Sequence, residues 1–376
     1  MRVLFLSETQ GWSGGAAQLL ALALGLRGKG AEISLASPAD GEAARRARDA
    51  GLRHIPMHPR QDYDLPTALR LRRMLIDEKI DVLHAHHPRA HAVGLLAMHC
   101  MGRRRPVYVV SRRVSFSVKS NPFSAFKYRS PRIDGYAAVA ENVRRQLIEA
   151  GVPPQRVRTI PSGVDTVRFS PADRDEALSR ELNLPDPGAQ GRGIAVIGKV
   201  ANYSPWKGQS VFFEAAARLL KTGREAVFLV AGRDTDGPEC RRAAQEAGLK
   251  EKDVRFLGFR SDVPRVLSLL DVSVNAAVQG EGISGALRES LAMSVPVVAS
   301  DAGGNAELVR EGKTGRLFCC GSSEELARVL GETLADPAAA RALAHAGREL
   351  VLREFSVEAL VERTEAYYRE LLARRA

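Results

Sequence analysis

Short runs of apolar, often β-branched residues alternate with helical patterns along this chain, and the chain contains two successive series of this alternation. In the first half the predicted strands are residues 3–7, 32–37, 82–84, 107–111, 135–139 and 157–160, and the predicted helices include residues 16–27 and 66–78. In the second half the predicted strands are residues 194–200, 227–232, 254–257, 272–275, 297–300 and 314–318, with helices at residues 209–222, 263–270 and 285–293. Strands separated by helices in this way form parallel sheets covered by helices. The pattern therefore predicts an α/β fold.

Residues 161–193 separate the two halves and are rich in Gly, Pro and charged residues, which is typical of a linker that carries one helix. A chain of 376 residues, 45% of them hydrophobic, is too long for one small core. We therefore expect two doubly wound, Rossmann-like domains, residues 1–168 and residues 169–356. Such sheets bind ligands at the carboxyl ends of their strands, so we expect the domains to face each other across a cleft.

The segment at residues 281–307, EGISGALRESLAMSVPVVASDAGGNAE, places Glu281 at a loop of small residues and Glu289 about one turn inside the following helix. The first turn of a helix leaves backbone N–H groups unpaired, and with the positive end of the helix dipole they suit a diphosphate. A carboxylate accepts hydrogen bonds from vicinal hydroxyls, so one Glu can hold a sugar and the other a ribose. The loop residues expected at this nucleotide-sugar site are Gly282, Ile283, Ser284 and Gly285. Alternatively, Glu289 is a solvated helix residue and the glycines only form a turn.

This segment resembles the Glu-x7-Glu signature of the retaining glycosyltransferases of family 4. Five further pieces resemble the family in its own order: GWSGGAAQLLALALGLRGKG, DVLHAHHPRA, IPSGVDTVRF, IGKVANYSPWKGQ and LGFRSDVPRVLSLLDV. The resemblance implies the two-domain architecture called GT-B, with the last helix, in residues 357–376, packing back on the first domain. It also implies transfer of a sugar from a nucleotide-diphosphate donor with retention of anomeric configuration.

The resemblance assigns roles to residues of both domains. Lys199 and Lys207 look like the basic pair that holds the donor diphosphate, where each could otherwise be a plain surface lysine. Glu281 would orient the sugar and Glu289 would hold the ribose. The loop that would meet the base through its backbone consists of Gly258, Phe259 and Arg260. The turn expected near the donor phosphate and the acceptor contains Gly14 and Gly15.

A cluster of histidines follows the strand predicted at residues 82–84. No carboxylate or cysteine at suitable spacing joins it, so a metal site is not indicated. The resemblance makes His86 a candidate cleft residue, and a structural or surface role is equally open. Many relatives carry a histidine after the strand predicted at 107–111, where this chain has Arg112 and Arg113. An arginine cannot act as a base, so we expect Arg112 to act through its charge.

No metal or other cofactor is expected beyond the donor itself. Asp234, Thr235 and Asp236 spell the DxD pattern of metal-dependent sugar transferases, but a turn rich in Asp and Gly explains them. The four cysteines show no metal-ligand spacing, and we expect them to be reduced.

The formal net charge of +11 is concentrated in residues 102–132, which hold nine Lys or Arg, no Asp or Glu, and several aromatic residues. Such a mixture is typical of a surface that meets an anionic membrane or an anionic glycolipid. It can also bind nucleic acid or form a solvated basic face. No nucleic-acid motif occurs elsewhere, so no nucleic-acid partner is expected.

These patterns together predict a sugar transferase acting on a glycan or glycolipid acceptor, in the assembly of bacterial cell-surface polysaccharide or lipopolysaccharide. The alternatives are a GT-B epimerase or phosphorylase, and a noncatalytic basic scaffold for anionic partners. The start, MRVLFLSETQGW, reads as a first strand and not as a signal peptide. We expect a cytoplasmic protein, with peripheral attachment to the inner face of the cytoplasmic membrane left open.

Overall fold

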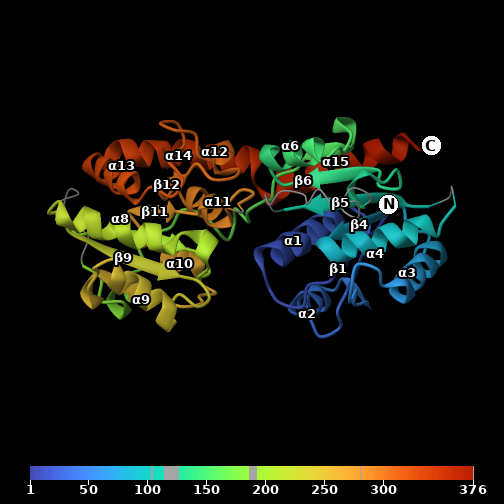
Figure 1. Ribbon diagram of the computed structural model, residues 1–376, viewed down its shortest axis with the longest axis horizontal. Helices are drawn as coiled ribbons and strands as arrows, with labels where there is room; N and C mark the ends of the chain where they lie inside the picture. Colours follow the sequence, from blue (N-terminus) through green and yellow to red (C-terminus); the bar gives the residue numbers. More distant parts are fainter. Residues whose placement is uncertain (103–104, 114–126, 186–192, 280, 376) are drawn as a thin grey trace. The chain divides into compact units, whose positions relative to one another are not determined.

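The computed structural model describes residues 1–102, 105–113, 127–185, 193–279 and 281–375. The chain divides into two compact units, the first consisting of Met1–Gly163 with Val357–Ala376 and the second of Val164–Ser356. Each unit contains one parallel sheet flanked by helices (Figure 1). The α/β class with two doubly wound sheets is therefore confirmed. The division lies a few residues before the expected boundary at residue 168.

The first unit contains a seven-stranded sheet in the order β3-β2-β1-β4-β5-β6-β7. Its strands are β1 Arg2–Ser7, β2 Glu32–Ser37, β3 Arg53–Pro56, β4 Val82–His86, β5 Val107–Arg112, β6 Gly135–Ala138 and β7 Val157–Thr159. Its helices include α1 Gly14–Gly28, α2 Glu42–Asp49, α3 Leu65–Asp77, α4 Pro88–His99, α6 Glu141–Glu149 and α15 Val357–Ala373. The short edge strand β3 was not predicted, because its four residues carry no buried side chain and no alternating pattern.

The second unit contains a six-stranded sheet in the order β10-β9-β8-β11-β12-β13. Its strands are β8 Ala195–Val200, β9 Ala226–Ala231, β10 Val254–Phe256, β11 Val272–Asn275, β12 Val297–Ser300 and β13 Arg316–Phe318. Its α-helices are α7 Glu176–Glu181, α8 Gln209–Lys221, α9 Pro238–Glu246, α10 Val263–Leu267, α11 Gly285–Ala292, α12 Asn305–Leu308, α13 Ser323–Ala335 and α14 Pro337–Glu354.

The strand order reverses once in each sheet, between β1 and β4 in the first unit and between β8 and β11 in the second. At such a point the two following helices cover opposite faces, so the connecting loops diverge and leave a crevice at the carboxyl ends of the strands. Lys199 is the last residue but one of β8, and the Glu281 loop follows β11. The sheet topology of the second unit therefore brings these two segments together.

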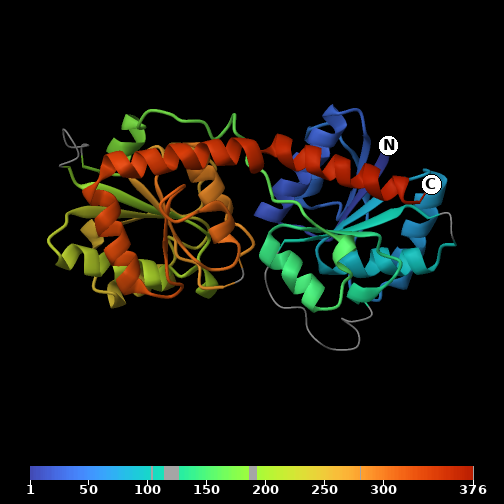
Figure 2. The ribbon, with the colours of Figure 1, turned by 90° about the horizontal axis from the view of Figure 1, so that it is seen from above.

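The C-terminal helix α15 packs against α1 of the first unit (Figure 2). The approach is close, because a Cβ atom on Gly25 of α1 would lie 2.3 Å from Cγ2 of Val361. Tyr368 of α15 is fully buried in the same hydrophobic cluster as Phe5 and Val82 of the sheet. Helix α15 therefore covers one face of the first sheet.

Candidate active site

The two predicted phosphate lysines lie at the crevice of the second unit. Lys199 is 2% exposed, and burial, with the nearby charge of Lys207, lowers its pKa to about 7, while Glu281 acts in the opposite direction. Nζ of Lys207 lies 2.5 Å from Oε1 of Glu281. Gly208 follows in the left-handed conformation, with φ of 66°, and a Cβ there would lie 1.9 Å from the carbonyl oxygen of Ala276. Glycine is therefore required at 208, where the loop packs against the end of β11.

The start of α11 completes this set of groups. Ser284 occupies the N-cap and makes no capping bond with its side chain, so its hydroxyl does not occupy the first-turn N–H groups. Gly303 has φ of 62°, and a Cβ there would lie 2.1 Å from the carbonyl oxygen of Glu281. The backbone of Gly303 therefore packs directly against the backbone of Glu281. The site joins two lysines, a helix N-terminus and a carboxylate, which suits an anionic, hydroxyl-rich ligand.

Glu289 lies inside α11, and burial raises its pKa whereas Arg288 and Arg168 lower it. Glu289 is half-buried, so its carboxylate is only partly open to solvent. Arg288, which sequence reasoning missed, is 5% exposed and donates from Nη1 to the carbonyl oxygen of Ile283 over 2.9 Å. Burial lowers its pKa to about 10, and Glu289 and Glu281 oppose that change. The only signal in the sequence was a charge beside Glu289 in an otherwise apolar helix.

Asn305, also missed, is fully buried behind the loop. Its Oδ1 accepts from the backbone N–H of Ser284 at 3.4 Å, and its Nδ2 donates to Oδ1 of Asn275 and to the carbonyl oxygen of Ser300. Asn305 thereby ties the start of α11 to the ends of β11 and β12. Nothing in the local sequence distinguishes this amide from a solvated one.

The expected base loop follows β10. Gly258 has φ of 61°, and its carbonyl oxygen accepts from the backbone N–H of Gly232 at 2.8 Å. Phe259 is 62% exposed, whereas the guanidinium of Arg260 is paired with Asp262 over 2.6 Å. The side chain of Arg260 is therefore held within the protein, which leaves the loop backbone and Phe259 to meet a ligand.

The DxD triplet forms a turn, as expected. Asp234 is left-handed with φ of 61°, and the buried Thr235 hydroxyl donates to the carbonyl oxygen of Gly232 at 2.9 Å. Among the residues that the structure describes, no group of three or more His, Cys, Asp or Glu side chains is arranged to hold a metal ion.

In the first unit, Gly14 and Gly15 open α1 behind the N-cap Ser13, whose Oγ accepts from the backbone N–H of Ala16. A Cβ on Gly15 would lie 3.4 Å from Nε2 of His87 and 3.9 Å from Cδ of Arg113. His87, not selected from the sequence, is left-handed with φ of 78° and lies within 3.2 Å of the Ser7 and Thr9 hydroxyls. Strained non-glycine residues of this kind are frequent at functional sites.

Of the two roles left open for His86, its place in the structure fits the structural one, and Arg112 contacts an aromatic hydroxyl. Because β4 extends to residue 86, His84 and His86 share one face of the sheet, and His86 is 1% exposed beside Phe5 and His84. His86 is thus an interior side chain that reaches no surface. Nη1 of Arg112 donates to the Tyr128 hydroxyl at 2.7 Å, whereas Arg113 lies beside Gly15 and donates to Oγ of Ser162 at 3.0 Å.

Two family models match the chain, Glycosyltransferase Family 4 over residues 12–168 and Glycosyl transferases group 1 over residues 192–336. The chain belongs to glycosyltransferase family 4. It is 31% identical over 247 residues to 2-deoxystreptamine glucosyltransferase of Streptomyces kanamyceticus, an alignment that covers 65% of this chain and 62% of that relative. It is 28% identical to phosphatidyl-myo-inositol mannosyltransferase of Mycobacterium leprae, over 89% of this chain and 87% of the relative. The fold matches that of HepE from Anabaena in complex with UDP and glucose, with a TM-score of 0.82, 22% identity and coverage of 98% and 100% of the two chains.

Residues 102–132 of this family 4 glycosyltransferase, the basic interval, expose only part of their basic side chains to solvent. Residues 103–104 and 114–126 lie outside the described residues. Of the six described Lys and Arg residues in the interval, Arg129 alone is exposed. Arg105 is paired with Asp134 over 2.8 Å and Lys127 with Asp62 over 3.1 Å, with 7% and 8% of those basic side chains exposed. Among the described residues no helix combines the length and apolarity of a membrane span.

The pKa of Lys199 predicts pH-dependent binding of a nucleoside diphosphate. A bound anion favours the ammonium form, so above pH 7 binding must include proton uptake and affinity should fall as pH rises. In the ligand-free protein, the unfolding free energy should increase above pH 7, because the unfolded chain holds this proton more tightly. Titration calorimetry between pH 7 and 9 measures the affinity. Lys199→Arg should flatten the profile, and a wild-type affinity that is constant with pH would contradict the assignment.

Proposed function

We propose that this family 4 glycosyltransferase transfers a sugar from a nucleotide-diphosphate donor to a glycan or glycolipid acceptor, with retention of anomeric configuration. The observation that carries the proposal is the convergence of Lys199, Lys207 and the α11 N-terminus beside Glu281 and Glu289. Two cations and a helix N-terminus neutralise a diphosphate, and the carboxylates accept from sugar and ribose hydroxyls. HepE, whose fold is shared, was solved with UDP-glucose, which supports this class of donor.

The proposed mechanism depends on stabilising the leaving group. As the bond from the anomeric carbon to the phosphate oxygen breaks, negative charge grows on the diphosphate, where Lys199 and Lys207 stand. The departing phosphate then accepts the proton of the acceptor hydroxyl, which attacks from the same side of the sugar. Glu281, held by Lys207, orients the sugar. In the first unit, Gly14, Gly15 and Arg113 are proposed to meet the acceptor, and the charge of Arg113 favours one that carries an anionic group.

The proposed acceptor is a component of bacterial cell-surface polysaccharide or lipopolysaccharide. The name of the Mycobacterium leprae relative, a mannosyltransferase for phosphatidyl-myo-inositol, supports a glycolipid. Attachment of residues 102–132 to an anionic membrane is part of the proposal. When this attachment is tested by charge reversal, Arg105 should be left unchanged, because its ion pair with Asp134 is internal. The exposed Arg129 is the better substitution.

Nucleotide binding by a Glu289→Ala variant tests the donor site. Among UDP, GDP and ADP, the nucleotide that raises the melting temperature of the wild type identifies the base. We expect Glu289→Ala to weaken its binding by about 1 to 3 kcal/mol, because a charged hydrogen-bond acceptor is lost. Stability should hardly change, since burial already disfavours this carboxylate. Unaltered affinity by calorimetry would show that Glu289 does not contact the nucleotide.

Turnover should be independent of divalent metal. If lysines and a helix terminus neutralise the diphosphate, EDTA should leave the transfer rate unchanged, whereas an enzyme that uses its DxD carboxylates would lose its metal-held leaving group. Rates with EDTA, and with EDTA followed by excess manganese, provide the measurement. A rate lost in EDTA and restored by manganese would move the diphosphate site to Asp234 and Asp236.

A further inference from the structure

A cavity of about 300 Å³ lies at the amino ends of the strands of the second sheet. Its lining includes Ala195 and Val272, the first residues of β8 and β11, and Pro296, which directly precedes β12. The strands are parallel, so this edge of the sheet is opposite to the edge that carries the donor crevice. Lys199 lies four residues further along β8 than Ala195, which corresponds to about 13 Å at the usual rise of a strand. The cavity is therefore separate from the donor crevice, and its size suits a small organic molecule.

Positive charge predominates in the lining of this cavity. Its arginines are Arg174, Arg224 and Arg341. Asp271 supplies one carboxylate, and its Oδ2 accepts from the backbone N–H of Val196 at 2.8 Å. Among the residues that the structure describes, none of these three guanidinium groups forms an ion pair with a carboxylate. Three guanidinium groups and one carboxylate give the lining a net formal charge of +2.

A cavity in the first unit shows how arginines are neutralised elsewhere in this protein. That cavity, of about 400 Å³, is also lined by three arginines, Arg144, Arg158 and Arg374. Arg144 is paired with Glu141 at 2.8 Å, and Arg158 and Arg374 are paired with Glu370 at 2.6 and 2.5 Å. These arginines already have anionic partners within the protein. Guanidinium groups that line a cavity without such partners suit an anionic ligand.

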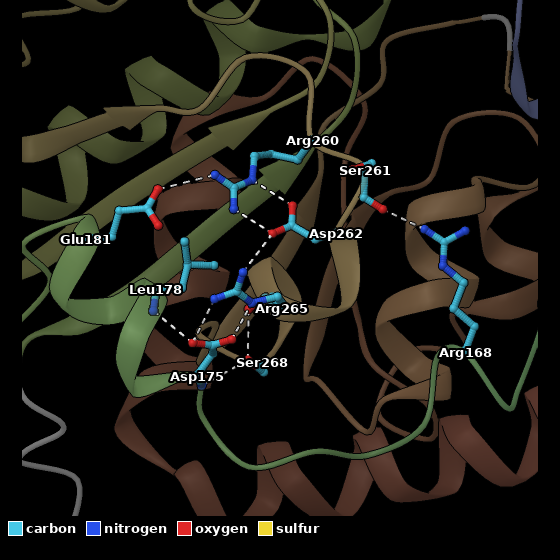
Figure 3. Close-up of polar contacts among 9 residues, drawn as sticks. All are labelled: Arg168, Asp175, Leu178, Glu181, Arg260, Ser261, Asp262, Arg265 and Ser268. Carbon is cyan, nitrogen blue, oxygen red and sulfur yellow. Dashed lines mark hydrogen bonds and ion pairs between the residues drawn. The ribbon is translucent and has the colours of Figure 1, made fainter.

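Polar contacts fix the wall of the cavity of the second unit on the side of α7 and α10. Arg174 donates from Nη1 to the carbonyl oxygen of Leu269 at 3.1 Å. The next residue, Asp175, donates its backbone N–H to Oγ of Ser268 at 3.2 Å, and its carboxylate is paired with Arg265 of α10 at 2.5 Å (Figure 3). These contacts hold Arg174 in place without neutralising its charge. A ligand therefore meets a preformed wall, which lowers the entropic cost of binding.

Ser294 adds a hydroxyl group to the lining of the cavity. It follows α11 with φ of 58°, a left-handed conformation that favours glycine or asparagine at this position after a helix. Among the described residues, its hydroxyl has no hydrogen-bond partner. Strained non-glycine residues are frequent at ligand sites, and this one leaves a hydroxyl available to a ligand.

We propose that this cavity binds a phosphomonoester that carries hydroxyl groups. The proposal does not depend on the proposed function, because the donor crevice lies at the other edge of the sheet. A phosphomonoester has a charge of about −1.5 to −2 near pH 7 and three acceptor oxygens, which match the net charge of the lining and the planar donors of Arg224 and Arg341. A single carboxylate would neutralise only half of this charge. The hydroxyl groups of the ligand donate to Asp271 and Ser294.

Titration calorimetry of the full chain with ribose 5-phosphate, glycerol 3-phosphate, inorganic phosphate and ribose tests the site. We expect at least one of the two phosphomonoesters to bind more tightly than inorganic phosphate, and ribose not to bind. Arg224→Ala and Arg341→Ala should each weaken that binding by about 10- to 100-fold, the range for losing one charge-assisted hydrogen bond. The proposal would be overturned if neither phosphomonoester bound the wild type at millimolar concentration, or if inorganic phosphate bound as tightly as both.

Two further variants separate this cavity from the donor crevice and from a general effect of charge. Arg218 is exposed in the last turn of α8, forms no ion pair among the described residues and does not line the cavity, so Arg218→Ala should change phosphomonoester affinity little. Lys199→Met should leave this affinity unchanged. A loss in Lys199→Met equal to that in Arg341→Ala would place the phosphate in the donor crevice. An equal loss in Arg218→Ala would reduce the effect to net charge, and either result would overturn the proposed site.

Discussion

Replacing Lys199 with methionine should reduce the rate of sugar transfer by about 100- to 1000-fold, the range for removing one preorganised group that stabilises transition-state charge. The unfolding free energy should remain the same or increase. Lys199 is 2% exposed and its pKa is lowered to about 7, which shows that burying the charged ammonium costs free energy in the folded protein. Methionine has a similar length and no charge, so it does not carry this cost. A loss of turnover without a loss of stability would identify a residue retained for function.

Turnover and urea unfolding of the same preparation provide both measurements. Lys221 lies exposed in the last turn of α8 and is the matched control, since Lys221→Met removes a lysine from the same unit without touching the crevice. A Lys199→Met enzyme with wild-type turnover would show that other groups carry the charge of the leaving diphosphate.

The Gly303→Ala substitution should lower the unfolding free energy by about 3 kcal/mol or more and abolish most activity. The left-handed backbone, with φ of 62°, accounts for about 1 kcal/mol. The rest arises because the new Cβ would lie 2.1 Å from the carbonyl oxygen of Glu281, so that one of the two backbone segments must move. Any such movement displaces the carboxylate that is expected to orient the sugar.

Gly312→Ala separates the clash from the backbone strain. Gly312 has φ of 65°, and no atom lies within 4 Å of the position its Cβ would take. This variant should therefore lose only about 1 kcal/mol and keep its activity. If chemical denaturation showed equal losses for Gly303→Ala and Gly312→Ala, the contact between Gly303 and Glu281 would not constrain the loop.

The sequence by itself determined the fold class and the edge of each sheet at which we propose that a substrate binds. Strand and helix periods are local properties, so the positions of β8 and β11 could be predicted, and with them the placement of Lys199 and Glu281 at carboxyl ends of parallel strands. The short, polar strand β3 carries no such period and was missed.

Only the tertiary structure decided which side chains meet and which are buried. Lys207 and Glu281 are 74 residues apart, and no local pattern shows that they form an ion pair. Nor does a local pattern show that the Asn305 amide accepts from the backbone of Ser284, or that Arg260 is paired with Glu181 of α7.

His86 and His87 illustrate the physical reason. They are adjacent in sequence, but successive side chains of a strand point to opposite faces, so two neighbouring histidines at the end of β4 can differ in burial. The strand continues through residue 86, and His86 is buried beside Phe5 and His84, while the left-handed backbone at His87 turns its ring toward Gly15. On the same face, Nδ1 of His84 lies 2.5 Å from the hydroxyl of Tyr368 in α15, a contact between residues 284 positions apart that the local sequence does not encode.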